Sequence, residues 1–258
     1  MALIIEYDGT RYYGFQFQGN LPTVQEEIEK ALGKLTGEKA RVLAASRTDT
    51  GVHARGQVVS FRTGSSLALE KFIGGLNFYL PRDIAVKAAY QVDYSFNIRK
   101  AAVSREYKYY ILNSPTRSPL KERFSYHVIG KLDTDQMNHA CQILIGTHDF
   151  ASFASRDVRL KNTVRTVLKA NVERDGELVV FGMVANSFLP HQIRNTVGTL
   201  IRIGQGKLAI EKLHSLMEAK KPGLAGPAAP AHGLFLMRID YPSPFGEVHE
   251  QDLRNQRI

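Results

Sequence analysis

The order of predicted elements in the first 92 residues constrains the fold more than any other feature. Hydrophobic periodicity and turn residues predict six elements there. They are, in order, a strand at 2–9, a helix at 21–37, strands at 40–46 and 56–62, a helix at 68–80 and a strand at 83–92. A β-α-β-β-α-β order is that of a ferredoxin-like or RRM-like unit.

The helix at 21–37 has recognisable signals at both ends. Thr23 and Glu26 have the spacing of a capping box, and Gly37 follows the last apolar residue of the stripe. Local sequence alone therefore predicts where this helix begins and where it ends.

The rest of the chain has a second mixed pattern. The predicted elements are a strand at 104–113, a helix at 133–146, a hairpin at 166–186 turned at Asp175-Gly176, helices at 190–204 and 209–223, and a strand at 232–241. Asp133 or Thr134 is the expected cap of the helix at 133–146. A connector rich in proline and serine, "NSPTRSPL", suggests a boundary near residue 113. We therefore expect an α+β protein with mostly antiparallel sheets. Its two halves would be residues 1–112 and 113–258, with a catalytic cleft between them.

Charge and cysteine content restrict the class of protein. The formal net charge is +9, which favours a polyanionic partner, with nucleic acid the first choice. The single cysteine, Cys141, lies among apolar residues and is interpreted as a buried thiol. No apolar run approaches a membrane span or the core of a signal peptide. These features predict a cytoplasmic protein that does not bind membranes.

The sequence does not match the common cofactor-binding and metal-binding motifs. The stretch "GQGK" at 204–207 lacks the first glycine of a phosphate-binding loop, and Leu208 stands where Ser or Thr is required. No G-x-G-x-x-G follows a strand. His53 lies near Asp49, but two candidate groups do not make a metal site. We expect neither a metal nor a cofactor.

A polar segment, "ASRTDTGVHARGQ", interrupts two predicted strands. Asp49 lies in it between Arg47 and Arg55, and Gly51 follows. One interpretation is a turn aspartate that hydrogen-bonds its own backbone. The other is a functional carboxylate, because a neighbouring arginine keeps a carboxylate ionised and an ionised carboxylate is a nucleophile. Asp8 and Asp149, the competing carboxylates, are interpreted as structural turn residues.

Basic and aromatic residues elsewhere fit a nucleic-acid ligand. Phosphate contacts are expected from a set of basic side chains with few acidic neighbours: Arg156, Arg159, Lys161, Arg165, Arg194, Arg202 and Lys207. The predicted strand at 104–113 carries Tyr107, Tyr109 and Tyr110, of which one could stack on an unpaired base. The residues alone thus indicate a protein that acts on RNA or DNA, without naming the reaction.

The motifs together resemble those of the tRNA pseudouridine synthase A family, almost from end to end. "YDGTRYYGFQFQ", "SRTDTGVHARGQVVSF" and "REYKYYI" are similar to three of its blocks. "GTHDFASF", "VRTV", "FLPHQIRNTVGTLIRIGQGK" and "GPAAPAHGLFLMRIDYP" follow in the family's order. Phe17 replaces a usual Arg, and Asn97, Ile98 and Lys100 interrupt a usual HARFSA.

The resemblance assigns roles position by position. It implies that Asp49 is catalytic and that Tyr107 contacts the target base. It implies that Arg194 pairs with the aspartate, and that Arg47 helps to displace the target nucleotide. The remaining residues expected to bind substrate are Leu234 and Leu236, of which one lines the uracil pocket, and Arg55 and His53 in the catalytic motif.

The activity implied by the resemblance is isomerisation of uridine to pseudouridine in the anticodon stem-loop of tRNA. Positions 38, 39 and 40 of the tRNA would be the targets, and a homodimer would act without metal or cofactor, on tRNA and not on DNA. Two alternatives are a non-catalytic RNA-binding module and a base-excising hydrolase. The module would not need the combination of Asp49, Arg194 and Tyr107, and the sequence shows no second carboxylate placed to activate water for a hydrolase.

Overall fold

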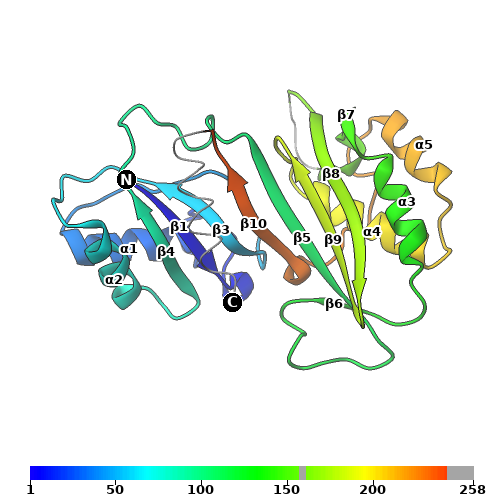
Figure 1. Ribbon diagram of the computed structural model, residues 1–258, viewed down its shortest axis with the longest axis horizontal. Helices are drawn as coiled ribbons and strands as arrows, with labels where there is room; N and C mark the ends of the chain where they lie inside the picture. The colour runs from blue at the N-terminus through cyan, green and yellow to red at the C-terminus, as the bar shows by residue number, and fades with distance from the viewer. Residues whose placement is uncertain (157–160, 243–258) are drawn as a thin grey trace. The chain divides into compact units, whose positions relative to one another are not determined.

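The computed structural model describes residues 1–156 and 161–242 of the chain. Its backbone divides into two units, of which Figure 1 shows the elements. Unit 1 is Met1–Arg105 together with the chain from Leu236 onward, and unit 2 is Glu106–Phe235. The predicted α+β class with mostly antiparallel sheets is confirmed.

Unit 1 is built on strands in the order β4-β1-β3-β10, with β2 beside β3. Their bounds are β1 Ala2–Tyr7, β2 Leu43–Ala44, β3 His53–Ser60, β4 Ile84–Tyr90 and β10 Leu234–Asp240. β1 pairs antiparallel with both β3 and β4, so it is an inner strand of the sheet, and its apolar residues are almost fully buried. The predicted order strand–helix–strand–strand–helix–strand is confirmed for residues 2–90.

The two helices of unit 1 are α1 (Val24–Thr36) and α2 (Leu69–Tyr79), and α2 packs on β4 and on α1. Thr23 caps α1, because its hydroxyl accepts a hydrogen bond from the amide of Glu26 at 3.4 Å. Gly37 ends the helix with φ 74°, as the sequence predicts. Gly75 of α2 lies directly against the side chain of Leu35, where a Cβ would come within 2.5 Å. Glycine at position 75 therefore lets the side chain of Leu35 pack directly against the backbone of α2.

Unit 2 has strands in the order β5-β9-β8-β7, with β6 parallel to β5. Their bounds are β5 Ser104–Asn113, β6 Tyr126–Val128, β7 Gly146–Asp149, β8 Val164–Asp175 and β9 Leu178–Ala185. The turn of the β8–β9 hairpin is one residue later than predicted, because Asp175 still pairs with Leu178. Gly176 is the first turn residue and has φ 56°, which favours glycine.

The helices of unit 2 are α3 (Thr134–Gln142), α4 (Gln192–Gly204) and α5 (Glu211–Ala219), grouped beside β7 and β8 in Figure 1. α3 packs on β8 and on α4. Asp133 caps α3 by accepting from the amide of Gln136 at 3.0 Å, which confirms one of the two predicted caps. No helix in the described part of the chain is both long and apolar enough to cross a membrane.

Candidate active site

The polar segment that carries Asp49 is a loop between β2 and β3, and β3 fixes where it begins. The strand predicted at 40–46 is only Leu43–Ala44, and the chain then leaves the sheet. Gln57 of β3 donates from Nε2 to the carbonyl of Ser46 at 2.6 Å and accepts from the amide of Ser46 at 3.3 Å. Gln57 is fully buried. A buried amide that forms both bonds holds the first turn of the loop to the strand that follows it.

The segment after β1 supports the middle of the loop. The hydroxyls of Tyr7 and Thr48 are 2.7 Å apart, and the amide of Phe15 donates to the carbonyl of Thr48 at 3.1 Å. Gly14 has φ 85°, and a Cβ there would lie 2.6 Å from the carbonyl oxygen of Thr48. Gly14 is therefore required both by its backbone angle and by the closeness of the loop.

The far side of the loop closes in a tight turn. The amide of Val52 donates to the carbonyl of Asp49 at 3.1 Å, and the amide of Gly51 donates to the carbonyl of Tyr12 at 3.2 Å. Gly51 has φ 75°, which glycine adopts without strain. Asp49 is half-buried and its neighbours Arg47 and Thr50 are exposed. The bonds of this turn involve main-chain groups.

His53 lies beneath the loop with 1% of its surface exposed. Its Nδ1 accepts a hydrogen bond from the amide of Gly9 at 3.0 Å and is 3.2 Å from Oδ1 of Asp8. Nδ1 thus lies within hydrogen-bonding distance of a main-chain amide and of a carboxylate oxygen, both in the turn after β1. His53 thereby ties the first residue of β3 to the turn after β1, and the structure places it inside unit 1.

The competing carboxylates, Asp8 and Asp149, each accept a hydrogen bond from a main-chain amide. Oδ1 of Asp8 accepts from the amide of Thr10 at 3.0 Å, and Oδ1 of Asp149 accepts from the amide of Ala151 at 2.9 Å. Asp8 is the N-cap of the short 3₁₀ helix η1 (Gly9–Arg11), and Asp149 bonds to the first residue of η2 (Ala151–Phe153). The turn roles predicted for Asp8 and Asp149 are confirmed.

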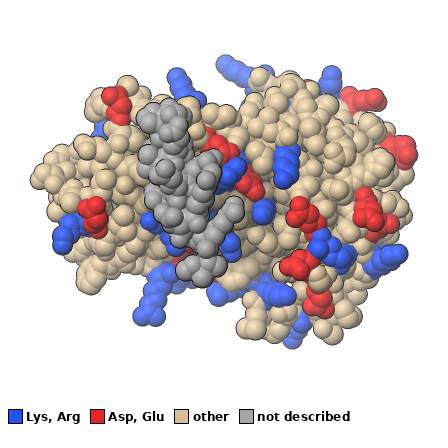
Figure 2. All heavy atoms as spheres, in the orientation of Figure 1, with Lys and Arg blue, Asp and Glu red and all other residues tan. Residues whose placement is uncertain are grey.

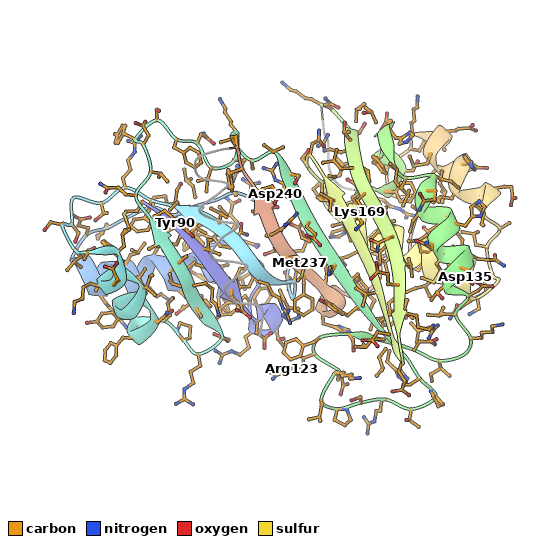
Figure 3. All side chains as sticks on the ribbon, viewed as in Figure 1. Tyr90, Arg123, Asp135, Lys169, Met237 and Asp240 are labelled. Carbon is orange, nitrogen blue, oxygen red and sulfur yellow. The ribbon has the colours of Figure 1, made fainter. Side chains whose placement is uncertain are left out.

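Two further predicted residues of unit 1 lie on neighbouring strands. Arg55 is exposed on β3, whereas Leu236 on β10 is fully buried. Position 56 is glycine because a Cβ there would lie 2.4 Å from the carbonyl oxygen of Met237, which is labelled in Figure 3. The C-terminal end of β10 is held by Asp240, also labelled, which accepts from the hydroxyl of Ser104. Unit 1 thus contains Arg47, Asp49, His53, Arg55 and Leu236.

The other three predicted residues belong to unit 2. Tyr107 on β5 is 5% exposed and meets the ring of Phe188 edge to face, with centroids 5.2 Å apart. Leu234, the first residue of β10, is also 5% exposed. Arg194 on α4 is half-buried and donates from Nε to the carbonyl of Ala229 at 2.7 Å.

The segment at 229–233 fixes the surroundings of Arg194. The amide of Ala229 donates back to the carbonyl of Arg194 at 2.9 Å, and the hydroxyl of Tyr109 donates to the carbonyl of Pro230 at 2.7 Å. Burial raises the pKa of Tyr109 above its usual range, against a smaller opposing effect of Arg194. Burial lowers the pKa of His232, and Arg194 lowers it further, whereas Ser125 and Glu122 oppose the shift. Tyr109 and His232 are therefore both neutral groups at pH 7 beside a charged arginine.

The motif around Arg194 is mainly structural. Oε1 of the fully buried Gln192 accepts from the amide of Leu189 at 2.8 Å, and Nδ2 of Asn195 donates to the carbonyl of Phe153 at 2.7 Å. At Gly198 a Cβ would lie 2.1 Å from the carbonyl oxygen of Pro227. The sequence did not predict these roles. Phe153 and Pro227 are distant in the chain from their partners on α4, and the bond between Gln192 and Leu189 forms only where the chain enters α4.

The basic residues proposed for phosphate contact have different surroundings. Arg156 donates to the carbonyl of Gly223 at 3.3 Å, and Arg165 donates to the carbonyl of Val164 at 2.6 Å, so both are tied to local backbone. Lys161, Arg202 and Lys207 are exposed, and Arg159 lies outside the described residues. On the face drawn in Figure 2, basic and acidic side chains are interspersed over the elements of unit 2. That face of unit 2 has no continuous basic patch.

The chemistry available in unit 1 is that of a carboxylate with nearby arginines. Within residues 1–156 and 161–242, no group of three His, Cys, Asp or Glu side chains could hold a metal ion. A carboxylate in a main-chain-supported loop can act as a nucleophile or as a base.

Comparison with known proteins identifies the family. A family model described as tRNA pseudouridine synthase matches residues 3–99 and 140–242. The chain belongs to the tRNA pseudouridine synthase family. Members of this family are isomerases that convert uridine to pseudouridine in tRNA.

Curated relatives agree along most of the length. The chain is 43% identical over 241 residues to tRNA pseudouridine synthase A of Acetivibrio thermocellus, covering 93% of this chain and 99% of the relative. It is 42% identical over 243 residues to the protein of the same name from Francisella tularensis subsp. tularensis, covering 93% of each chain. A solved Cbf5-Nop10-Gar1 complex aligns with TM-score 0.36 and 14% identity, covering 78% of this chain and 45% of that chain. Family membership therefore rests on sequence.

Proposed function

We propose that Asp49 is the catalytic carboxylate with which this chain converts uridine to pseudouridine in the anticodon stem-loop of tRNA, at positions 38, 39 and 40. The observation that carries this proposal is the main-chain support of the Asp49 loop. The side chain of Gln57 bonds to main-chain groups at the start of the loop, and the amide of Phe15 bonds to a carbonyl in its middle. The carbonyl of Tyr12 accepts from an amide at its end. A loop so determined presents one carboxylate at a fixed place, which catalysis requires.

The chemistry explains why a carboxylate suffices. The bond from ribose C1′ to uracil N1 breaks, a bond from C1′ to C5 forms, the proton on C5 is released and N1 gains a proton. Nothing is oxidised or reduced. Asp49 could attack C1′ as in retaining glycosidases, abstract a ribose proton to give a glycal, or add to C6 of uracil. The three routes share one carboxylate and remain open.

The remaining residues follow from the resemblance. Tyr107 contacts the target base, Arg47 helps to displace the target nucleotide from its stack, and one of Leu234 and Leu236 contacts the uracil. Arg194, Arg55 and His53 complete the substrate-binding set. Removing a base from its stack costs a few kcal/mol, which contacts to phosphates offset. We further propose that the chain works as a homodimer in the cytoplasm.

Tritium release tests the catalytic assignment. Unmodified tRNA labelled at C5 of uridine must lose its label when pseudouridine forms. We expect release with the wild-type protein and a loss of roughly 10⁴-fold or more with Asp49→Asn, the scale seen when a catalytic nucleophile is removed. Asp149→Asn is the matched control, because an asparagine oxygen can still accept from the amide of Ala151.

The results separate the two main hypotheses. Binding of tRNA by the wild type, Asp49→Asn and Asp149→Asn, with label released by the wild type and Asp149→Asn but not by Asp49→Asn, supports Asp49. Binding without release by the wild type would favour a non-catalytic RNA-binding module. Release of free uracil in place of pseudouridine would indicate a hydrolase.

A further inference from the structure

Arg99, which the sequence analysis did not single out, lies on a turn that is fixed from two sides. Oδ1 of Asn97 accepts from the amides of Arg99 and Lys100 at 3.1 and 3.0 Å. The neighbouring Ile98 is buried, and its carbonyl accepts from the hydroxyl of Tyr241 at 2.9 Å. Asn97, one of the departures from the family pattern, thus caps the turn that presents Arg99.

The guanidinium of Arg99 reaches the start of the Asp49 loop. Its Nη2 donates to the carbonyl of Ala44 at 3.1 Å, three residues before Arg47 in the chain. A guanidinium has five N–H donors, and this bond uses one of them. In the described part of the chain, no acidic side chain forms an ion pair with Arg99. Charge and donors therefore remain for a ligand.

A second arginine locks this arrangement. Arg105 is 7% exposed and donates to the carbonyls of Ala102 at 3.1 Å and Arg99 at 3.0 Å. Its Nη2 also lies 3.5 Å from the carbonyl of Ala45. Because a buried guanidinium must keep its donors satisfied, Arg105 holds the turn at Arg99 against the residues that open the Asp49 loop.

The positive charges of Arg99 and Arg47 lie close enough to interact. Partial burial lowers the pKa of Arg99, and the nearby charge of Arg47 lowers it further. Arg99 nevertheless stays protonated at neutral pH, since arginine does not lose its proton in proteins. Arg99 is held by its bond to the carbonyl of Ala44, and an anion that contacts both Arg99 and Arg47 reduces the repulsion between the two charges.

We propose that Arg99, beside Arg47, binds a backbone phosphate of the RNA strand next to the uridine on which Asp49 acts. This inference rests on the proposed function and adds a residue that positions the substrate. Arginine suits this contact because its planar fork matches a phosphate with two parallel hydrogen bonds. Arg99 is bound to loop backbone at Ala44, so a phosphate held there is placed relative to Asp49.

Binding at several salt concentrations tests the proposal. The probe is an anticodon stem-loop RNA, with Arg99→Gln, Arg99→Lys and the control Arg41→Gln. Arg41 is exposed and already pairs with Glu29, so its loss removes one charge without a free phosphate contact. For Arg99→Gln we expect about tenfold weaker binding and a salt-dependence slope smaller by about 0.7 to 1, the value for one lost phosphate contact.

The variants also separate phosphate binding from a structural role. Arg99→Lys should retain most of the slope, because it retains the point charge. In tritium release, Arg99→Gln should raise KM more than it lowers kcat, as for a contact made equally in ground and transition states. If the RNA affinity of Arg99→Gln depends on salt as steeply as that of the wild type, the proposal is overturned, whether or not the melting temperature is lower. Arg99 would then serve only to hold the backbone at Ala44. If the wild type binds RNA but releases no tritium, the catalytic proposal fails, and the slope alone still decides for or against Arg99.

Discussion

Replacement of Gly14 by alanine tests whether the segment after β1 positions Asp49. At Gly14 φ is 85°, and an added Cβ would lie 2.6 Å from the carbonyl oxygen of Thr48 and 3.2 Å from the carbonyl carbon of Asp49. Ordinary van der Waals contact begins near 3.4 Å, so the loop must move by about 3.4 − 2.6 = 0.8 Å. A misplacement of about 1 Å can cost a reaction about 10²-fold in rate. We expect Gly14→Ala to lower kcat by that order.

Gly19→Ala is the matched control in the same segment. Gly19 has φ 53°, and nothing lies within 4 Å of an added Cβ. Both variants suffer the strain of a left-handed alanine, about 1 kcal/mol, which is about 2–4 °C in melting temperature for a chain of this size. Only Gly14→Ala moves the loop. Equal losses of kcat in the two variants, measured by tritium release at saturating tRNA, would refute positioning by Gly14.

Two further predictions concern buried titratable groups. Because the pKa of His232 is lower in the folded chain than in the unfolded one, the unfolded state binds more protons as pH falls through 6.5. The free energy of unfolding should therefore decrease as the pH is lowered through that window. The urea midpoint of His232→Asn should decrease less steeply than that of the wild type over the same pH range. Equal pH dependence of the two urea midpoints would contradict this. Burial raises the pKa of the Cys141 thiol to about 12, so the folded protein should resist a thiol reagent at pH 8 and react once unfolded. Rapid modification before unfolding would contradict the buried placement.

The parts of the fold that the sequence predicted well depend on neighbouring residues. The cap at Thr23, the stop at Gly37 and the cap at Asp133 each require a partner within four residues. The sequence also predicted the element order of unit 1, since strand and helix periodicities are local properties.

Elements that depend on distant partners were predicted less well. The helix predicted at 133–146 ends at Gln142, and Gly146 already begins β7, which pairs with β8. The strand predicted at 40–46 is short because Ser46 bonds to the side chain of Gln57 instead of continuing the ladder. β6 is stabilised by parallel pairing with β5, a contact that periodicity does not reveal.

The candidate site shows the same division. A motif located Asp49, but the contacts that hold its loop come from Tyr12, Gly14 and Phe15, which no spacing rule links to it. Arg99 and Arg105 were missed for the same reason. These arginines donate to the main-chain carbonyls of Ala44, Ala45 and Ala102. Every residue has a carbonyl, so the sequence does not indicate which ones accept a hydrogen bond from an arginine.

Main-chain support of the loop has a consequence for mutagenesis. The bonds that fix it use the amide and carbonyl of Ser46, the carbonyls of Thr48 and Asp49, and the amide of Gly51. Substitution of a side chain leaves these groups in place. Asp49→Asn also keeps the size and shape of the half-buried side chain, so we expect its melting temperature to stay closer to that of the wild type than the melting temperature of Gly14→Ala does. Gly14→Ala removes no functional group, yet it moves the loop. Large kcat losses in both, with near-normal stability only in Asp49→Asn, would separate the chemistry of the carboxylate from its placement.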